Sequence, residues 1–197
     1  MFQLGPLKNT PLRYGWVTLI FHWSMAIGIT GMFCLGWWMV DLDYYDAWYQ
    51  RGPNLHRSLG VVMMLVWLAR LGWRWASVQP VMSGDRLQTR LASTLHWTFY
   101  VLIPLLGLSG YLITTADGRG VAVFDWFTIP ASLTGVDNQE DLAGEIHWYL
   151  ALSIIVGACL HSLAALKHEF IDRDGTLSKM LGRKVPDTKN VNPIEDE

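Results

Sequence analysis

His147 and His161 lie fourteen residues apart in an apolar stretch that carries no Asp, Glu, Lys or Arg. Fourteen residues return an α-helix to within about 40° of its starting face and advance it by about 21 Å. In a membrane-spanning helix, the two imidazoles would therefore face the same way at opposite sides of the bilayer. Ionisable side chains at membrane depth are usually functional, and imidazole is a common axial ligand of haem iron. The spacing predicts one helix that offers a ligand to each of two stacked haems.

The segments that must position these histidines are long enough to cross a membrane. Residues 16–40, 91–116 and 146–166 contain no charged side chain, and each exceeds the length of about 20 residues that a spanning helix needs. A fourth segment is weaker, because only twelve residues separate Arg57 from Arg70. The mean hydropathy of +0.22 fits a membrane domain. We predict an all-α membrane protein, a four-helix transmembrane bundle with spans at about 16–40, 54–75, 91–116 and 145–168.

Basic residues indicate which side of the membrane each loop faces. An even number of spans puts both termini on one side, and twelve of the fifteen Lys and Arg residues belong to that side. Loops rich in Lys and Arg stay in the cytoplasm. We therefore predict a cytoplasmic N-terminal segment 1–15, a four-span domain 16–181 and a cytoplasmic polar tail 182–197.

Alternating the spans sorts five of the six histidines into two layers. His22, His96 and His161 fall near the inner face, whereas His56 and His147 fall near the outer face. Two haems with two imidazoles each need one pair per layer, so the outer pair is His56 with His147. In the inner layer His161 shares the face of His147, and its partner is either His22 or His96. The alternative is a haem-free membrane scaffold or transporter that uses these histidines in a polar network between helices.

Other residues bear on how a haem would be held. There is no C-x-x-C-H motif, so attachment would be by coordination alone. Cys34 and Cys159 would lie near opposite faces, too far apart for a disulfide. Arg57 and Arg70 flank the layers and match the carboxylate geometry of haem propionates, although Arg70 also suits snorkelling to the headgroups. Glycines in the spans would let a flat macrocycle approach, or would serve helix packing: Gly28, Gly31, Gly60, Gly107, Gly110 and Gly157.

The outer side is acidic, and its longest loop, residues 117–144, contains an apolar piece at 121–129. That piece is predicted either as a short amphipathic element on the membrane surface or as a loop packed over the helix ends. The outer loops and helix starts hold nine carboxylates against three arginines. Such a face repels anions and attracts basic proteins.

Several short motifs resemble the bacterial cytochrome b561 family, whose members are small four-helix, di-haem inner-membrane proteins. The likeness runs from about Tyr14 to Leu181 and includes Phe21-His22-Trp23, the segments 54–60 and 91–111, Glu145-Ile146-His147-Trp148, and residues 160–168. The resemblance implies that His22 and His161 hold the inner haem b, and that His56 and His147 hold the outer one. It leaves His96 without a ligand role.

The resemblance also implies electron transfer between the quinone pool and a redox partner on the periplasmic side of a bacterial inner membrane. His168 and Lys167 become candidates for a quinone site, with a basic membrane-edge anchor as the alternative. In superoxide oxidase members, superoxide is oxidised outside and ubiquinone is reduced inside. The chain would then be a superoxide:ubiquinone oxidoreductase, an electron carrier, or a cytochrome b subunit that anchors a periplasmic dehydrogenase or hydrogenase. We expect lipid, quinone, and superoxide or a periplasmic redox protein as partners, and no nucleic acid.

Overall fold

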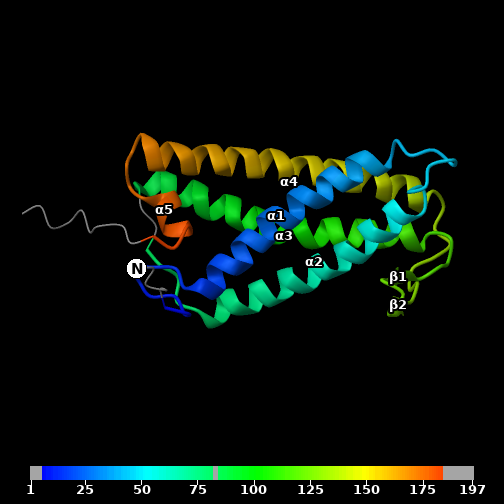
Figure 1. Cartoon of the computed structure of the whole chain (residues 1–197), viewed down its shortest axis with the longest axis horizontal. Helices are drawn as coiled ribbons and strands as arrows, with labels where there is room; N and C mark the ends of the chain where they lie inside the picture. The colour runs from blue at the N-terminus through cyan, green and yellow to red at the C-terminus, as the bar shows by residue number, and fades with distance from the viewer. Residues whose placement is uncertain (1–5, 82–83, 184–197) are drawn as a thin grey trace, which may run out of the picture.

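A computed structural model of the chain describes residues 6–81 and 84–183 (Figure 1). Its long helices are α1 (Trp16–Met39), α2 (Arg51–Ala76), α3 (Arg86–Thr115) and α4 (Gln139–Phe170). The strands β1 (Val121–Val123) and β2 (Phe127–Ile129) connect α3 to α4, and the short helix α5 (Thr176–Met180) follows α4. Within the described ranges, four helices are long and apolar enough to cross a membrane. The predicted four-helix membrane fold is confirmed.

Two of the helices begin well before the apolar segments from which the spans were predicted. α3 begins at Arg86 because Asp85 and Gln88 form a capping box: Gln88 N donates to Asp85 Oδ1 (2.8 Å) and Asp85 N donates to Gln88 Oε1 (3.1 Å). α4 begins at Gln139, whose side-chain amide donates to the Leu112 carbonyl at 2.9 Å. Polar residues thus extend both helices beyond the segment that an apolar run can indicate.

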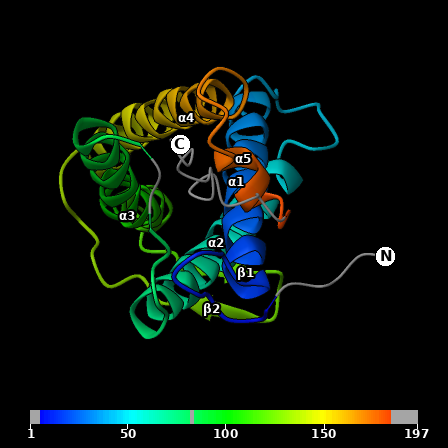
Figure 2. The same ribbon diagram turned by 90° about the vertical axis from the view of Figure 1, so that its left-hand side faces the viewer.

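The helices pack as two close pairs, α1 with α2 and α3 with α4, and contacts between the pairs are fewer. Figure 2 shows the four helices arranged around a common centre. Large apolar side chains such as Ile27, Leu65 and Leu163 are exposed on the outside of the bundle, as expected for helices that face lipid tails. Cys34 and Cys159 are both free thiols. Because the four helices surround a common centre, both helix pairs contribute side chains to it.

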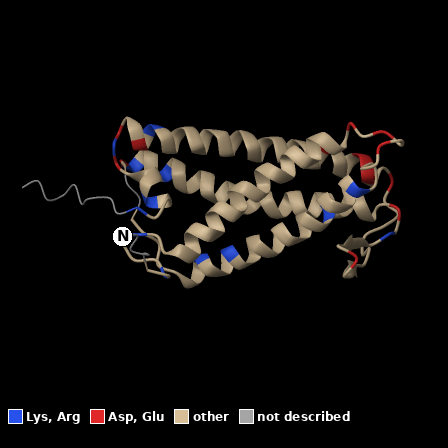
Figure 3. Ribbon diagram, in the orientation of Figure 1, with Lys and Arg blue, Asp and Glu red and all other residues tan. Residues whose placement is uncertain are grey.

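The bundle has two chemically different ends. Residues 6–15, the α2–α3 connection and α5 lie at one end, called here the terminal end (Figure 1). The α1–α2 loop and the β1–β2 hairpin lie at the opposite end, called the hairpin end. Lys and Arg predominate at the terminal end and Asp and Glu at the hairpin end (Figure 3). The predicted tail, with Lys184 and Lys189, lies outside the described residues from position 184 onward.

The apolar piece of the longest loop forms an antiparallel hairpin in which Val121 pairs with Ile129. Val121 and Val123 are buried, and the Phe124 N–H donates to Ser58 Oγ of α2 at 3.0 Å. The hairpin therefore packs over the helix ends, which agrees with the second of the two predictions for this segment. Burial alternates along β1 but not along β2, and three residues per strand are too few for a period-2 pattern to be recognised in the sequence.

Candidate functional site

His56 of α2 and His147 of α4 meet near the hairpin end. Their ring centroids are 6.3 Å apart and their planes are inclined by 69°. His56 Nδ1 is buried and has no hydrogen-bond partner within the described part of the chain. A buried polar nitrogen without a partner costs free energy, so the His56 ring is suited to bind a ligand between the two helices.

His22 of α1 and His161 of α4 form a second pair, nearer the terminal end. Their ring centroids are also 6.3 Å apart, with planes inclined by 57°. The neighbouring Trp23 donates its indole N–H to the Met180 carbonyl of α5 at 2.9 Å. This bond ties the first half of α1 to the segment that follows α4, and so helps to hold the two helices of the pair in register.

The two equal spacings suit a metal held between imidazoles. A metal lies about 2 Å from a coordinating imidazole nitrogen, which is itself about 1.1 Å from its ring centroid, so two rings on opposite sides of one iron have centroids about 6.2 Å apart. Both observed separations of 6.3 Å match this value. At each of the two levels, the separation of the imidazole pair is therefore one that a haem iron held between two histidines would fit.

His96 of α3 is the third imidazole on the level of His22 and His161. Its ring centroid is 5.3 Å from that of His161, with planes inclined by 65°. This separation is about 1 Å shorter than two ligands of one iron require. The geometry therefore favours His22 over His96 as the partner of His161, the choice that the sequence left open.

Hydrogen bonds orient the His147 ring. Its Nδ1 lies 3.0 Å from Ser109 Oγ and 3.2 Å from the Leu106 carbonyl, both on α3. A carbonyl only accepts, so an Nδ1–H that donates to Leu106 leaves the Nε2 lone pair available. Bonds of this kind fix the tautomer and orientation of histidine ligands. Ser109 was not among the predicted site residues, and its position 38 residues before His147 gave no local signal.

Glycines contact the ligand candidates at two positions. A Cβ added at Gly36 would lie 3.1 Å from His56 Cε1, and one added at Gly110 would lie 3.2 Å from His147 Cε1. Gly28, Gly107 and Gly157 instead accommodate methionine or phenylalanine side chains, which is ordinary helix packing. Of the glycines named from the sequence, Gly110 thus lies beside a ligand candidate, and Gly36, which was not named, lies beside another. Whether either glycine admits a macrocycle stays a prediction.

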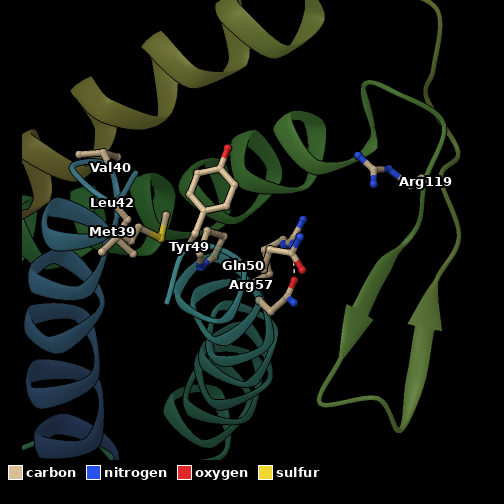
Figure 4. Close-up of a pocket in the computed structure, with 9 residues that line it drawn as sticks. Met39, Val40, Leu42, Tyr49, Gln50, Arg57 and Arg119 are labelled. Atoms are coloured by element: carbon tan, nitrogen blue, oxygen red, sulfur yellow. Dashed lines mark hydrogen bonds between the residues drawn. The ribbon is translucent and has the colours of Figure 1, made fainter. Parts of the chain in front are cut away.

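Arg57 lies at the hairpin end, one residue beyond His56. Its guanidinium donates to the Asn54 side chain and lines a cavity of about 740 Å³ together with Tyr49, Gln50 and Arg119 (Figure 4). Arg119 forms an ion pair with Asp117, and this hydrogen-bonded partner lowers the pKa of the Asp117 carboxyl. Arg57 therefore has a polar partner and faces an open cavity with a second guanidinium.

Lys167 and His168 lie in the last turn of α4 and contact carboxylates that follow the helix. Lys167 Nζ donates to Asp172 Oδ2 at 2.7 Å, and His168 Nδ1 lies 2.9 Å from Asp172 Oδ2 and 3.2 Å from Asp174 Oδ2. The hydrogen bond from Lys167 lowers the pKa of Asp172. The predicted pair of bases is thus part of a cluster with two carboxylates at the terminal end.

Comparisons with known proteins agree with this architecture. The family model described as prokaryotic cytochrome b561 matches residues 13–183. The chain is 46% identical over 181 residues to cytochrome b561 homolog 2 of Escherichia coli (strain K12), covering 91% of this chain and 96% of that protein.

Two further relatives are more distant. Cytochrome b561 homolog 1 of Escherichia coli (strain K12) is 25% identical, covering 92% of this chain and 99% of the relative. A probable superoxide oxidase, CybB, of Yersinia pestis is 24% identical, covering 87% and 97%. Membership implies a b-type haem, and both histidine pairs fit that group. The chain belongs to the prokaryotic cytochrome b561 family of membrane electron-transfer proteins.

Proposed function

We propose that the protein moves electrons across a bacterial cytoplasmic membrane through two b-type haems. The observation that carries the proposal is the equal 6.3 Å spacing of the His22–His161 and His56–His147 pairs. One pair would hold the inner haem and the other the outer haem. The haems supply reversible one-electron reduction when bound, and the chain supplies their position.

The chain's own residues would determine how far an electron travels and in what surroundings. His147 and His161 on α4 separate the two sites by about 21 Å along the helix axis. The four histidines are partly buried among apolar helices, so protein groups would stabilise much of the charge at each site in place of solvent. The bond between His147 and α3 keeps one ligand in a single tautomer.

The excess of Lys and Arg at the terminal end supports a cytoplasmic location for both termini. The hairpin end would then face the periplasm. Ubiquinone is proposed to react near the terminal end, because Lys167 and His168 lie there at the membrane edge beside Asp172. Quinone reduction takes up protons as well as electrons, and an imidazole between carboxylates is suited to pass protons from the cytoplasm.

Superoxide oxidation is a second candidate activity at the hairpin end. It is favoured by the cavity that Arg57 and Arg119 line, since the Arg57 guanidinium forms no ion pair within the described residues and attracts a small anion, whereas Arg119 is paired with Asp117. One relative is named a probable superoxide oxidase. The nine carboxylates of the outer loops and helix starts oppose it by repelling anions. A soluble periplasmic redox protein is the alternative electron donor or acceptor.

Haem counting with single variants tests the ligand assignment. Purified wild-type protein should contain two haems per chain. His22→Ala and His161→Ala should each leave one haem with the same spectrum, and His56→Ala and His147→Ala should each leave the other. His168→Ala, which removes an imidazole outside both pairs, should retain two. A wild-type content of one haem, or two haems in His147→Ala, would contradict the proposal.

Stopped-flow mixing separates the candidate partners. Rapid haem reduction by superoxide followed by reoxidation with ubiquinone would establish the superoxide:ubiquinone activity. Haem reduction by a quinol, with no response to superoxide, would instead indicate a periplasmic protein partner. Co-purification of a large periplasmic subunit would identify the chain as an anchoring cytochrome subunit.

A further inference from the structure

Two arginines of α2 lie against aromatic rings of α3. The Arg70 guanidinium carbon is 5.7 Å from the Tyr100 ring centroid, and that of Arg74 is 5.3 Å from the same centroid and 5.4 Å from that of Trp97. Both arginines are partly buried. These contacts direct the guanidiniums from α2 toward α3, along the less closely packed side between the two helix pairs.

Neither arginine has an acidic partner among the residues described. The ion pairs of that part of the chain involve other side chains, and Arg74 makes only a long hydrogen bond, 3.4 Å, to Gln79 Oε1. Aromatic faces offset part of the cost of desolvating a cation, but they do not neutralise its charge. Within residues 6–81 and 84–183, no carboxylate therefore pairs with either of the two positive charges.

The aromatic contacts also place these charges close to the His22–His161 level. Tyr100 is four residues after His96 and so lies on the same face of α3. The His96 ring in turn contacts the His161 ring at 5.3 Å. Arg70 lies within electrostatic range of all three imidazoles of this level.

We infer that Arg70 and Arg74 raise the reduction potential of the inner haem above that of the outer haem. The inference depends on the proposed function, since it assumes a haem at each histidine pair. A ferric haem carries one more positive charge than a ferrous haem, so a nearby cation favours the reduced form.

The surroundings of the outer pair have the opposite charge. Arg119 is paired with Asp117, which leaves Arg57 and Arg51 against the remaining carboxylates of the outer loops and helix starts: Asp41, Asp43, Asp46, Asp125, Asp137, Glu140, Asp141 and Glu145. Negative charge favours the ferric form. These eight carboxylates are exposed, where solvent screens them, so they only weakly reinforce the direction that Arg70 and Arg74 set for electrons, from the hairpin end to the terminal end.

The size of the effect can be bounded. A unit charge about 10 Å from a redox centre, at an effective dielectric constant near 20, changes the ferrous-to-ferric ratio roughly tenfold. For a one-electron couple, a tenfold change corresponds to 59 mV. Each arginine should therefore have an effect that an optical redox titration resolves.

The test is redox titration of the full-length protein with the substitutions Arg70→Gln and Arg74→Gln. Single-haem variants, His22→Ala and His147→Ala, first assign the two potentials in the wild type, where the inner haem should have the higher one. Each glutamine variant should make the inner haem roughly tenfold harder to reduce, while the outer potential moves less. Arg90→Gln is the matched control, because it removes an exposed charge of the same end, where solvent screens it.

Lysine variants separate charge from packing. Arg70→Lys and Arg74→Lys keep the positive charge and should retain most of the wild-type potential. A higher potential for the outer haem, or an inner potential unchanged by both glutamine substitutions, would overturn the inference while leaving two haems and hence the proposed function intact. If the reduction potential of the inner haem fell as far in the lysine variants as in the glutamine variants, the inference would also be overturned. A wild-type protein with fewer than two haems would instead contradict the proposed function.

Discussion

The ring of His96 packs edge-on against the ring of His161, with centroids 5.3 Å apart. His22 faces the same His161 ring from α1 at 6.3 Å. Three helices thus bring an imidazole to one level, but only one of the two distances to His161 leaves room for a metal between the rings. The shorter contact suits a side chain that supports the orientation of a ligand.

This difference predicts opposite results for two substitutions. His96→Ala should keep two haems per chain, with a broadened absorption band for the inner haem, because His161 loses a contact that limits its rotation. His22→Ala should lose the inner haem. The measurement is the haem-to-protein ratio together with the low-temperature spectrum of the reduced protein. Retention of the inner haem in His22→Ala and its loss in His96→Ala would show that the ligand pair is assigned wrongly.

Ser109→Ala should weaken the outer site without abolishing it. The substitution removes one of the two groups next to His147 Nδ1 and leaves the Leu106 carbonyl at 3.2 Å. Loss of an outer-shell partner typically costs about 10-fold to 100-fold in metal affinity, and the remaining carbonyl favours the lower value. The rate of haem transfer to an excess of an apo-protein acceptor reports this affinity.

Ser162→Ala is the control for that experiment. Its hydroxyl bonds only to the Ala158 carbonyl within α4 and it is exposed. Its haem release should match the wild type. Equal rates in Ser109→Ala and Ser162→Ala would indicate that the Leu106 carbonyl alone orients His147.

The helical fold and the histidine layers were predictable because their signals repeat along the sequence. Apolar runs mark the membrane helices, and the fourteen-residue interval between His147 and His161 places both on one face of α4. The choice between His22 and His96 depends on a difference of 1 Å between ring separations. Sequence spacing alone carries no such information.

Contacts between distant segments account for what the sequence did not indicate. Gly36 and Ser109 become part of the outer site only because their helices lie beside His56 and His147. The hairpin is stabilised by Ser58 of α2, 66 residues away from Phe124. No local pattern specifies such pairings, since they follow from the way in which the helices pack.

The ion pair between Lys167 and Asp172 should depend on pH in a defined direction. The hydrogen bond from Lys167 lowers the pKa of Asp172, so the carboxyl is more acidic in the folded protein than in the unfolded chain. Because the pKa is lower in the folded protein, the ion pair stabilises the fold at pH values above the unfolded pKa of about 3.9. This stabilisation is lost as the pH falls through the folded pKa. Between pH 5 and pH 8, the turn that follows α4, which this ion pair holds against the helix, should therefore remain intact.

An NMR titration of the Asp172 carboxyl in detergent checks this prediction. Lys167→Met should raise its midpoint toward the ordinary value for aspartate. Arg173→Gln, which removes a neighbouring cation that does not contribute to the shift, should leave the midpoint unchanged. The result would contradict the structure if both variants behaved alike.

Alanine at Gly36 or Gly110 should selectively damage the outer site. The new methyl groups would lie 3.1 Å from His56 Cε1 and 3.2 Å from His147 Cε1, closer than ordinary contact, and would displace the ring from the position in which it could hold the proposed haem.

We expect outer-haem occupancy to fall severalfold in each variant, measured as the haem-to-protein ratio, while the inner haem is retained. Gly31→Ala is the matched control, because the same methyl group in the same helix as Gly36 would meet nothing within 4 Å. If Gly31→Ala lost as much outer haem as Gly36→Ala, the effect would arise from helix stiffness, and close contact with the ligand rings would not be its cause.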